Sequence, residues 1–399
     1  TDDCEESPND VPLYATTDHI DDLKFDHNEV KTLLSKLSIA KSIGPDGVHP
    51  KLLRYLSHDD GFVRTITHLF QLIYDLGEMP TIWKTANVTA LHKKGEKGLA
   101  SNYRPISLTS VLSKVFEKLL RNHILRHFTP HCYEQQHGFQ PKKSCLSNLL
   151  DCMDTVYDLL DDEGSADIIY LDFQKAFDTV SHRKLLQKLS WYGITGKTLN
   201  IVSNFLSDRE FRVRVGGHLS SPRHVSSGVP QGSVLGPLLF LIFINDIPCG
   251  IEGYISLFAD DVKMVCSTLD KASVQADLNK LDDWQKRWLL SFNTNDNKCK
   301  ILHVGKKNPQ HCYVLGGAEL PTTDSEKDLG VLVNETLDWR LQINKAVKKA
   351  KSVIGWTTRN VISREKDVLL NIYKSLVRPH LEYCTQSVSY THLTLPTIE

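Results

Sequence analysis

The hydrophobic positions along the chain follow two different periods. Apolar residues at helical spacing predict helices over 62–73, 110–128, 146–160, 238–247, 278–288, 341–354 and 366–376. Asp26, with Glu29 three residues later, predicts the capped start of another helix. Runs of strand composition lie at 86–91, 166–173, 211–215, 254–258, 262–266, 297–304 and 328–333. Because helices and strands occur in blocks, the pattern predicts an α+β fold with several lobes.

Three acidic residues stand at the ends of predicted strands. The run Ile168–Leu171 is almost continuously apolar, which predicts a central strand, and Asp172 follows it. The runs 254–258 and 262–266 are typical of a hairpin with Asp260 and Asp261 at its turn. Carboxylates at the edge of a core need solvent or a cation to stay ionised, so the pair indicates a divalent metal site. For the dipeptide alone, an ordinary Asp-Asp turn is the alternative.

Composition describes an ordinary globular protein. The 399 residues are 41% hydrophobic and 24% charged, enough for two or three subdomains. The longest apolar run, Leu238–Ile244, is too short to span a membrane and fits a buried helix. Nine irregularly spaced Cys form neither a disulfide framework nor a zinc pattern, which predicts a reducing, intracellular setting. The chain starts at Thr1 without a signal peptide, so we expect a piece of a longer product.

Charge is balanced overall but unevenly distributed. The formal net charge is −1, yet residues 1–30 carry ten Asp or Glu against one Lys, and residues 339–378 carry ten Lys or Arg against two acidic residues. The acidic start, to about residue 25, is predicted to be a linker. The basic segment predicts a phosphate-bearing partner, with Lys345, Lys348, Lys349 and Lys351 on the polar side of its first helix. A solvated helix face is the alternative.

Two loops add candidate binding residues. Lys93, Lys94 and Lys97 lead from a predicted strand to Asn102-Tyr-Arg-Pro105, a basic hairpin that can hold a triphosphate or a nucleic-acid strand. A solvent-exposed loop is the alternative. In the loop 226–233, Gly228 and Gly232 let the backbone approach a planar ligand closely, although a bare turn explains the same residues.

Together these features suit two-metal phosphoryl transfer. In that chemistry carboxylates hold two divalent ions, which activate the attacking oxygen and neutralise the leaving one. Hard oxygen ligands favour Mg²⁺, and basic residues neutralise the phosphates.

The chain resembles a known family, the reverse transcriptases of non-LTR retrotransposons of the LINE type, which are related to jockey and CR1 elements. The resemblance extends from about residue 41 to about residue 383. It rests on blocks that occur in a fixed order: Ile43-Gly-Pro-Asp-Gly-Val-His-Pro50, Asn102-Tyr-Arg-Pro-Ile-Ser-Leu108, Gln136-His-Gly-Phe139, Leu171-Asp-Phe-Gln-Lys-Ala-Phe-Asp178, Gly228-Val-Pro-Gln-Gly-Ser-Val-Leu-Gly-Pro237 and Phe258-Ala-Asp-Asp261.

The resemblance implies a right-hand polymerase fold. Fingers would span 26–165, a palm 166–333 and a basic helical thumb 334–386. The stretch 387–399 does not resemble the family and looks like a foreign tail. An endonuclease domain and a Cys/His zinc knuckle, which such proteins often carry, are not visible in this sequence.

The resemblance also implies roles for single residues. Asp172, Asp260 and Asp261 match the catalytic, metal-binding carboxylates, and the carbonyl of Phe173 matches a backbone metal ligand. Phe177 matches the ring that excludes a 2′-hydroxyl, while Gln231 and Gly232 match the loop against the incoming nucleotide. Arg104, with Lys93 or Lys94, matches the finger residues that grip the triphosphate. Lys298 matches a lysine that protonates pyrophosphate.

The implied activity is RNA-directed DNA polymerisation. It would use two Mg²⁺ ions, with Mn²⁺ as a possible substitute, an RNA template, a DNA primer and dNTPs, and no membrane; the oligomeric state stays open. The implied setting is the nucleus and cytoplasm, as a ribonucleoprotein with the element's RNA. The alternatives are an RNA-dependent RNA polymerase, which Phe177 disfavours, and an inactive or domesticated copy that only binds RNA.

Overall fold

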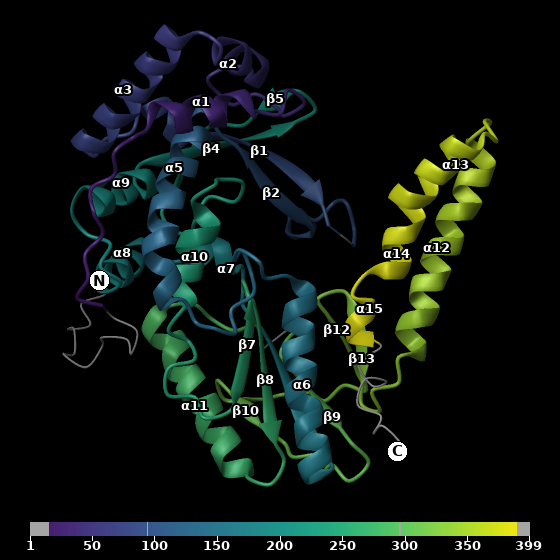
Figure 1. Ribbon diagram of the computed structural model, residues 1–399. Coiled ribbons are helices and arrows are strands. Elements are labelled where there is room, and N and C mark those ends of the chain that lie inside the picture. The colour runs from purple at the N-terminus through teal and green to yellow at the C-terminus, as the bar shows by residue number, and fades with distance from the viewer. Residues whose placement is uncertain (1–15, 94, 295–296, 389–399) are drawn as a thin grey trace, which may run out of the picture. The chain divides into compact units, whose positions relative to one another are not determined.

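The computed structural model describes residues 16–93, 95–294 and 297–388 (Figure 1). Within them the chain forms two compact units, each built from separate stretches. The first unit comprises residues 16–133, Gln174–Cys249 and Lys286–Leu290; the second comprises Glu134–Phe173, Gly250–Gln285 and residues 291–388. Three predicted features lie wholly or mostly outside the described residues: Lys94, the acidic linker in its residues 1–15, and the foreign tail in its residues 389–399.

The first unit is mainly helical. Its helices are α1 (His27–Ser35), α2 (Pro50–Leu56), α3 (Asp60–Leu76), α4 (Thr81–Lys84), α5 (Val111–Phe128), α7 (Ala176–Thr179), α8 (His182–Trp191), α9 (Gly196–Leu206) and α10 (Gly236–Ile244). The start of α1 is capped as the sequence predicts, because the Glu29 amide donates to the Asp26 carboxylate at 2.8 Å. Gly77, with φ of 69°, ends α3 in the left-handed conformation that glycine adopts without strain.

A five-stranded sheet lies within the first unit. Its strands are β1 (Thr85–His92), β2 (Tyr103–Leu108), β4 (Arg209–Val215), β5 (His218–Leu219) and β6 (Arg223–Val225). They pair in the order β2-β1-β4-β5, with β6 also on β4; only β1 and β4 run parallel. Because β2 is an edge strand, it tolerates Pro105, which has no amide to donate. The predicted basic hairpin 86–104 is therefore confirmed as the β1–β2 pair.

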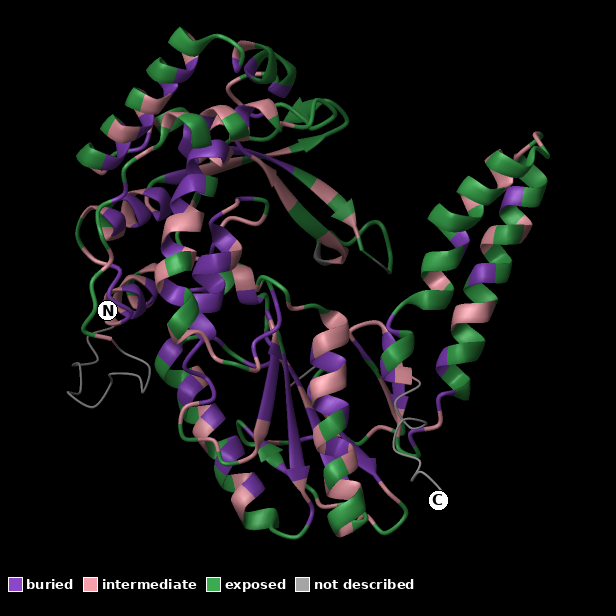
Figure 2. Ribbon diagram, viewed as in Figure 1, coloured by how far each residue is buried: buried purple, intermediate pink, exposed green. Residues whose placement is uncertain are grey.

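The second unit contains the predicted central strand. β3 (Ala166–Asp172) lies between β8 (Asp261–Ser267) and β9 (Lys300–Val304), and β7 (Tyr254–Phe258) completes the antiparallel order β7-β8-β3-β9. α6 (Cys145–Glu163) crosses this sheet in Figure 1 and packs on β3, β7 and β8. The short strands β10 (Val314–Leu315), β11 (Ala318–Glu319), β12 (Ser325–Asp328) and β13 (Val331–Asn334) form two hairpins. Figure 2 shows β7 and β8 almost wholly buried, which explains their apolar sequence.

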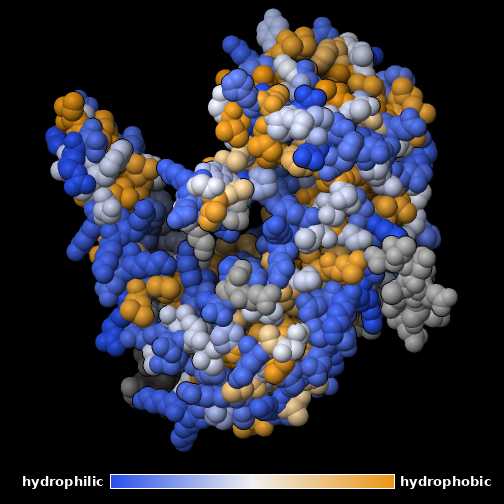
Figure 3. All heavy atoms as spheres, turned by 180° about the vertical axis from the view of Figure 1, so that it is seen from behind, coloured by the Kyte–Doolittle hydropathy of each residue, from blue (hydrophilic) through white to orange (hydrophobic). Residues whose placement is uncertain are grey.

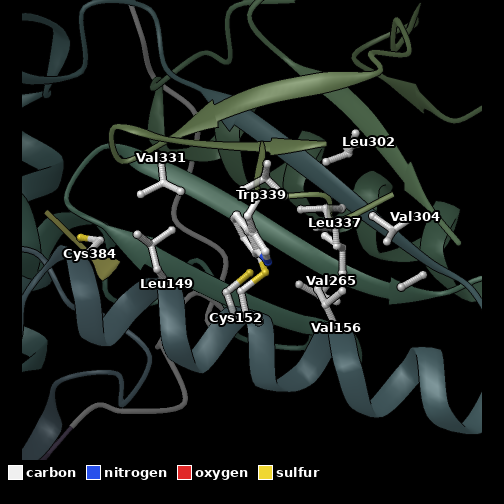
Figure 4. Packing of buried hydrophobic residues seen from close by; sticks show 14 residues of the cluster. Leu149, Cys152, Val156, Val265, Leu302, Val304, Val331, Leu337, Trp339 and Cys384 are labelled. Carbon is white, nitrogen blue, oxygen red and sulfur yellow. The ribbon is translucent and has the colours of Figure 1, made fainter. Parts of the chain in front are cut away.

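One apolar cluster joins the sheet, α6 and the C-terminal segment of the second unit (Figure 4). Leu149, Cys152 and Val156 of α6 point toward Val265 and Leu302 of the sheet. Val331 and Trp339, which follow much later in the chain, fill the same core. Removal of this apolar surface from water stabilises the unit.

The remaining helices are α11 (Lys271–Trp288), α12 (Arg340–Asn360), α13 (Lys366–Ile372), α14 (Arg378–Glu382) and α15 (Thr385–Val388), with a π-helical turn over Tyr373–Val377. The mixture of helices and largely antiparallel sheets confirms the predicted α+β class. One predicted strand is wrong: 328–333 is not continuous, because Leu329 and Gly330, both with positive φ, make a tight turn between β12 and β13. No helix in the described part of the chain is long and apolar enough to cross a membrane.

Candidate active site

The three predicted carboxylates belong to adjacent strands of the second unit. Asp172 ends β3 and is the direct register partner of Asp261, the first residue of β8. Register partners on antiparallel strands point to the same face of a sheet, with Cβ atoms roughly 5 Å apart. Asp260 precedes Asp261 in the turn that joins β7 to β8. The fold therefore brings Asp172 next to Asp261, although the two residues are 89 positions apart in the chain.

The turn that carries Asp260 has a strained backbone and is held by hydrogen bonds to Gln136. Ala259 has φ of 55°, an unfavourable conformation for a residue with a Cβ. Its amide donates to Gln136 Oε1 at 3.1 Å, and the Gly138 amide donates to the same oxygen at 2.7 Å. A side chain at Gly138 would place its Cβ only 2.3 Å from the Ala259 nitrogen. The block Gln136-His-Gly138 thus holds the turn that carries Asp260, a role that local sequence patterns did not reveal.

Negative charge is concentrated at this edge of the sheet. The Asp261 carboxyl is desolvated by the protein around it and repelled by Asp260 and Asp172, which together raise its pKa to about 6. Lys298 Nζ lies 3.0 Å from Asp172 Oδ2 and forms an ion pair with it. The predicted Lys298 is therefore in direct contact with one of the predicted catalytic carboxylates.

Phe173, whose carbonyl the resemblance assigns to a metal, is fixed by its ring. The ring stacks on Phe292 with centroids 4.4 Å apart. Next to it, the Asn293 amide donates to the Asp172 carbonyl at 2.7 Å. These contacts hold the end of β3 in place beside the carboxylates.

A pocket of about 180 Å³ adjoins the carboxylates within the second unit. Its lining combines both charges: Asp172, Asp261, Lys298, Lys300, Glu326 and Asp328 are among the residues. Lys263, two residues after Asp261, forms a buried ion pair with Asp328 of β12 at 2.7 Å. The β12–β13 hairpin is thereby tied to the strand that carries Asp261.

The carboxylates of Asp172, Asp260 and Asp261 are groups that can bind divalent cations. Carboxylate oxygens are the ligands that Mg²⁺ prefers, and a cation would offset both the desolvation and the repulsion that raise the Asp261 pKa. Lys298 partly neutralises Asp172 in this structure. Among the described residues, however, no three His, Cys, Asp or Glu side chains are gathered closely enough to form a complete metal centre. Water and phosphate oxygens would have to complete the coordination, as Mg²⁺ commonly requires.

The nucleotide-loop residues predicted from the resemblance meet in the first unit. The Val229 amide donates to the Phe177 carbonyl at 2.7 Å, and Gln231 Nε2 donates to Asp178 Oδ1 at 2.9 Å. The Phe177 ring stacks on Phe240 of α10 with centroids 4.4 Å apart. Gly232 has φ of 101°, and a Cβ there would lie 2.6 Å from the Ser107 carbonyl oxygen. The loop thus needs glycine at this position for two independent reasons.

A pocket of about 400 Å³ opens beside this loop. Gln231, Asp178, Ser107 and Pro105 line it, together with apolar side chains of β1 and β4. A pocket with apolar walls and a few polar groups is typical of a small-molecule site.

A buried carboxylate that sequence patterns missed anchors the end of the loop. Glu117 of α5 is 1% exposed and accepts hydrogen bonds from the amides of Val234, at 2.7 Å, and Leu235, at 3.3 Å. The Ser113 hydroxyl donates to its other oxygen. Burial raises the pKa of Glu117, while these hydrogen bonds and the charge of nearby Arg209 act in the opposite direction. At its own position in a helical pattern, Glu117 looks like a surface residue.

The predicted finger residues lie on the β1–β2 hairpin. Arg104 is exposed and pairs in register with Leu91. Because side chains alternate along a strand, Arg104 faces away from the pocket that Pro105 and Ser107 line. The Lys93 amide donates to the Asn102 carbonyl, which closes the hairpin. Lys94 lies outside the described residues, so its predicted contact with a triphosphate stays a prediction.

The predicted thumb lysines lie on α12 of the second unit. Lys345, Lys348, Lys349 and Lys351 are all exposed, and the buried residues of α12 are Gln342, Ala350 and Thr357. In Figure 3 hydrophilic residues predominate along the helices at the left of the view, with hydrophobic residues gathered near their far end. Figure 2 likewise shows α12 largely exposed. The predicted basic face is therefore open to solvent.

Comparisons with known proteins cover most of the chain. A family model described as reverse transcriptase (RNA-dependent DNA polymerase) matches residues 91–360. The RNA-directed DNA polymerase from mobile element jockey of Drosophila funebris is 30% identical over 379 residues, which is 90% of this chain and 41% of that protein. The Drosophila melanogaster jockey protein is 28% identical, again over 90% of this chain and 41% of the relative.

A further relative is the probable RNA-directed DNA polymerase from transposon BS of Drosophila melanogaster. It is 30% identical over 80% of this chain and 36% of that protein. The chain thus spans about two fifths of the length of these relatives. The resemblance to jockey-type elements is confirmed, and the chain belongs to the reverse transcriptase (RNA-dependent DNA polymerase) family.

Proposed function

We propose that this chain carries the polymerase activity of a non-LTR retrotransposon and copies RNA into DNA. The observation that carries the proposal is the register pairing of Asp172 with Asp261, beside Asp260 in the strained hairpin turn. The names of the relatives, which include the RNA-directed DNA polymerase from mobile element jockey, support it. The substrates would be an RNA template, a DNA primer and dNTPs.

The reaction forms one phosphodiester bond. The primer 3′-oxygen attacks the α-phosphorus of a dNTP, the bond to the bridging oxygen breaks, and pyrophosphate leaves. The primer hydroxyl proton passes to solvent, and Lys298, held beside Asp172 at 3.0 Å, would donate a proton to the pyrophosphate.

Asp172, Asp260, Asp261 and the carbonyl of Phe173 would hold two Mg²⁺ ions, for which Mn²⁺ is a possible substitute. When bound, such ions activate the attacking oxygen and stabilise the charge on the leaving oxygen. The protein's own contribution is to hold these ligands rigidly, through the Gln136 contacts to the turn and the stacking of Phe173 on Phe292.

Residues of the first unit would select the nucleotide. Phe177, fixed by stacking on Phe240, would exclude a 2′-hydroxyl, and Gln231 with Gly232 would pack against the incoming dNTP. Arg104, with Lys93 or Lys94, would grip the triphosphate. The lysines of α12 would contact the template–primer backbone.

These roles correspond to a right-hand polymerase, with fingers in 26–165, a palm in 166–333 and a thumb in 334–386. The two compact units are discontinuous in sequence, so this linear division remains part of the proposal.

Primer extension on poly(rA)/oligo(dT) with Mg²⁺ tests the proposed function. Incorporation of dTTP supports it. Extension with UTP in preference to dTTP would favour an RNA-dependent RNA polymerase instead. Template binding without any extension, with Mg²⁺ or with Mn²⁺, would favour an RNA-binding protein that has lost the activity.

A further inference from the structure

Asp178 is an acidic residue for which the proposed reaction has no role. It follows Phe177 directly in α7 and lines the pocket of the first unit together with Gln231. Its Oδ1 accepts a hydrogen bond from Gln231 Nε2 at 2.9 Å. The contact joins residues 53 positions apart, each next to or within a segment to which nucleotide binding is assigned.

The backbone on both sides of this contact is already fixed. The Gly228 amide donates to the Val180 carbonyl at 2.8 Å, and the Ser227 hydroxyl donates to the Asp178 carbonyl at 3.0 Å. A Cβ at Gly228 would lie 2.6 Å from that same carbonyl oxygen, so the two segments are in close contact. On the other side, the Ser107 amide donates to the Gln231 carbonyl at 3.0 Å. What remains to be set at Gln231 is the direction of its side chain.

A carboxylate sets that direction in only one way. The side-chain amide of glutamine has a donor end and an acceptor end, and an ionised carboxylate can only accept. Asp178 therefore draws the NH₂ group toward itself and turns the carbonyl oxygen, Oε1, away from α7. The second N–H and Oε1 are then available in a defined orientation for a ligand in the pocket.

We infer that Asp178 is a positioning residue that orients Gln231 for the incoming nucleotide. This inference rests on the proposed function, because that function assigns Gln231 to the nucleotide. The Phe177 ring is held separately by Phe240, at 4.4 Å between centroids. Loss of the Asp178 carboxylate is thus expected to weaken nucleotide binding without changing the choice between dNTP and rNTP.

Steady-state primer extension on poly(rA)/oligo(dT) tests the inference with four variants. Asp178→Ala is expected to raise the KM for dTTP about fivefold, the effect of losing one hydrogen bond at a partly exposed site. The kcat is expected to stay within about twofold of wild type, because no reacting group is removed. Asp178→Asn is expected to restore the KM only in part, because the Asn Oδ1 can accept from Gln231 but its NH₂ group can also donate to the Gln231 Oε1. The double variant Asp178→Ala/Gln231→Ala is expected to match Gln231→Ala alone.

Asp75→Ala is the matched control. Asp75 lies on α3 in the same unit and pairs with Lys197 at 2.8 Å, and it does not line the pocket. Its KM for dTTP is expected to equal that of wild type. Thermal unfolding of every variant shows whether a change in KM reflects a loss of folding.

Three results overturn the inference while leaving the proposed function intact. The first is that Asp178→Asn raises the KM as much as Asp178→Ala does, and the second is that the effects of Asp178→Ala and Gln231→Ala are additive. The third is that Asp178→Ala changes the preference for dTTP over UTP by the same factor as it changes the KM for dTTP. Affinity for dTTP, measured on a dideoxy-terminated primer where chemistry is blocked, gives the same comparison without turnover. If wild type neither extends the primer nor binds dTTP in that complex, the proposed function fails, and this inference fails with it.

Discussion

Asp260 and Asp261 are neighbours in sequence but occupy different positions. Asp260 lies in the turn that Gln136 supports, whereas Asp261 already belongs to β8 and faces Asp172 across the sheet. From the resemblance we propose that Asp260 is the firmer metal ligand and that the loss of Asp261 is partly tolerated. The strain at Ala259 is consistent with a turn whose geometry is constrained by function.

Asp260→Asn is therefore expected to lower the kcat of primer extension by roughly a thousandfold or more, because a charged ligand is lost from the reacting centre. Asp261→Asn is expected to cost less. Template–primer affinity, measured by fluorescence anisotropy, should change by no more than about twofold in either variant, since neither removes a cationic contact. Full activity of Asp260→Asn would contradict the metal-binding role.

The buried carboxyl group of Glu117 is expected to make the free energy of unfolding depend on pH. Burial raises its pKa above the ordinary 4.5, so above that pH the unfolded chain loses the proton before the folded chain does. The free energy of unfolding should then fall as pH rises from 4.5, by up to about 1.4 kcal/mol per pH unit, until the folded group also ionises. Glu117→Gln cannot titrate, so this contribution to the slope disappears. Urea unfolding of both proteins between pH 4.5 and pH 7 measures the difference.

Ser113→Ala is the control for Glu117. It removes the hydroxyl that donates to Glu117 at 3.0 Å but leaves the carboxyl group able to titrate. It should lower stability and retain the pH slope of wild type. Identical slopes for wild type and Glu117→Gln would show that burial does not shift this group.

At the scale of elements, α12 presents a basic face whose partner is proposed to be nucleic acid. Replacing Lys345, Lys348 and Lys349 by Glu is expected to weaken template–primer binding and to reduce its salt dependence. Each phosphate contact contributes about 0.9 to the slope of log affinity against log salt concentration, so a loss of about two to three is expected. Filter binding between 50 and 200 mM KCl provides the measurement.

The matched control for α12 makes the same charge change elsewhere. Lys271, Lys306 and Lys307 are exposed residues of the same unit that lie outside α12. Their replacement by Glu should leave the salt slope close to that of wild type. If both triple variants reduce affinity and slope equally, the effect is one of net charge, and α12 is only a solvated face.

The elements also explain which features could be predicted. The strand ending at Asp172 and the Asp260–Asp261 hairpin were predictable because apolar runs and turn residues are local signals. The strand predicted over 328–333 was wrong because Leu329-Gly330 makes a turn inside an otherwise strand-like run. The hydrogen bonds of Gln136 to Ala259 and of Glu117 to Val234 join residues more than a hundred positions apart, and no local pattern contains them.

The segments predicted along the sequence, 26–165, 166–333 and 334–386, do not coincide with the two compact units of the folded chain. The chain passes between the two units five times, after residues 133, 173, 249, 285 and 290. The first unit consequently includes Lys286–Leu290, a short stretch that begins in the last turn of α11. Composition and periodicity place this stretch in one helix with the residues before it, so only the folded chain reveals the division.

Trp288 is the principal side chain of that stretch and gives a test at this scale. It is 3% exposed, packs against Trp191 and Phe243, and receives the ammonium group of buried Lys188 at 3.7 Å from its ring centroid. Trp288→Ala is expected to lower the free energy of unfolding by roughly 3–5 kcal/mol, because it leaves a cavity and removes this contact of a buried charge.

Trp356→Ala is the control: that ring is 53% exposed on α12, and its loss should cost less than about 1 kcal/mol. Urea unfolding followed by far-ultraviolet circular dichroism compares them. Equal losses would mean that the first unit does not depend on its stretch from α11.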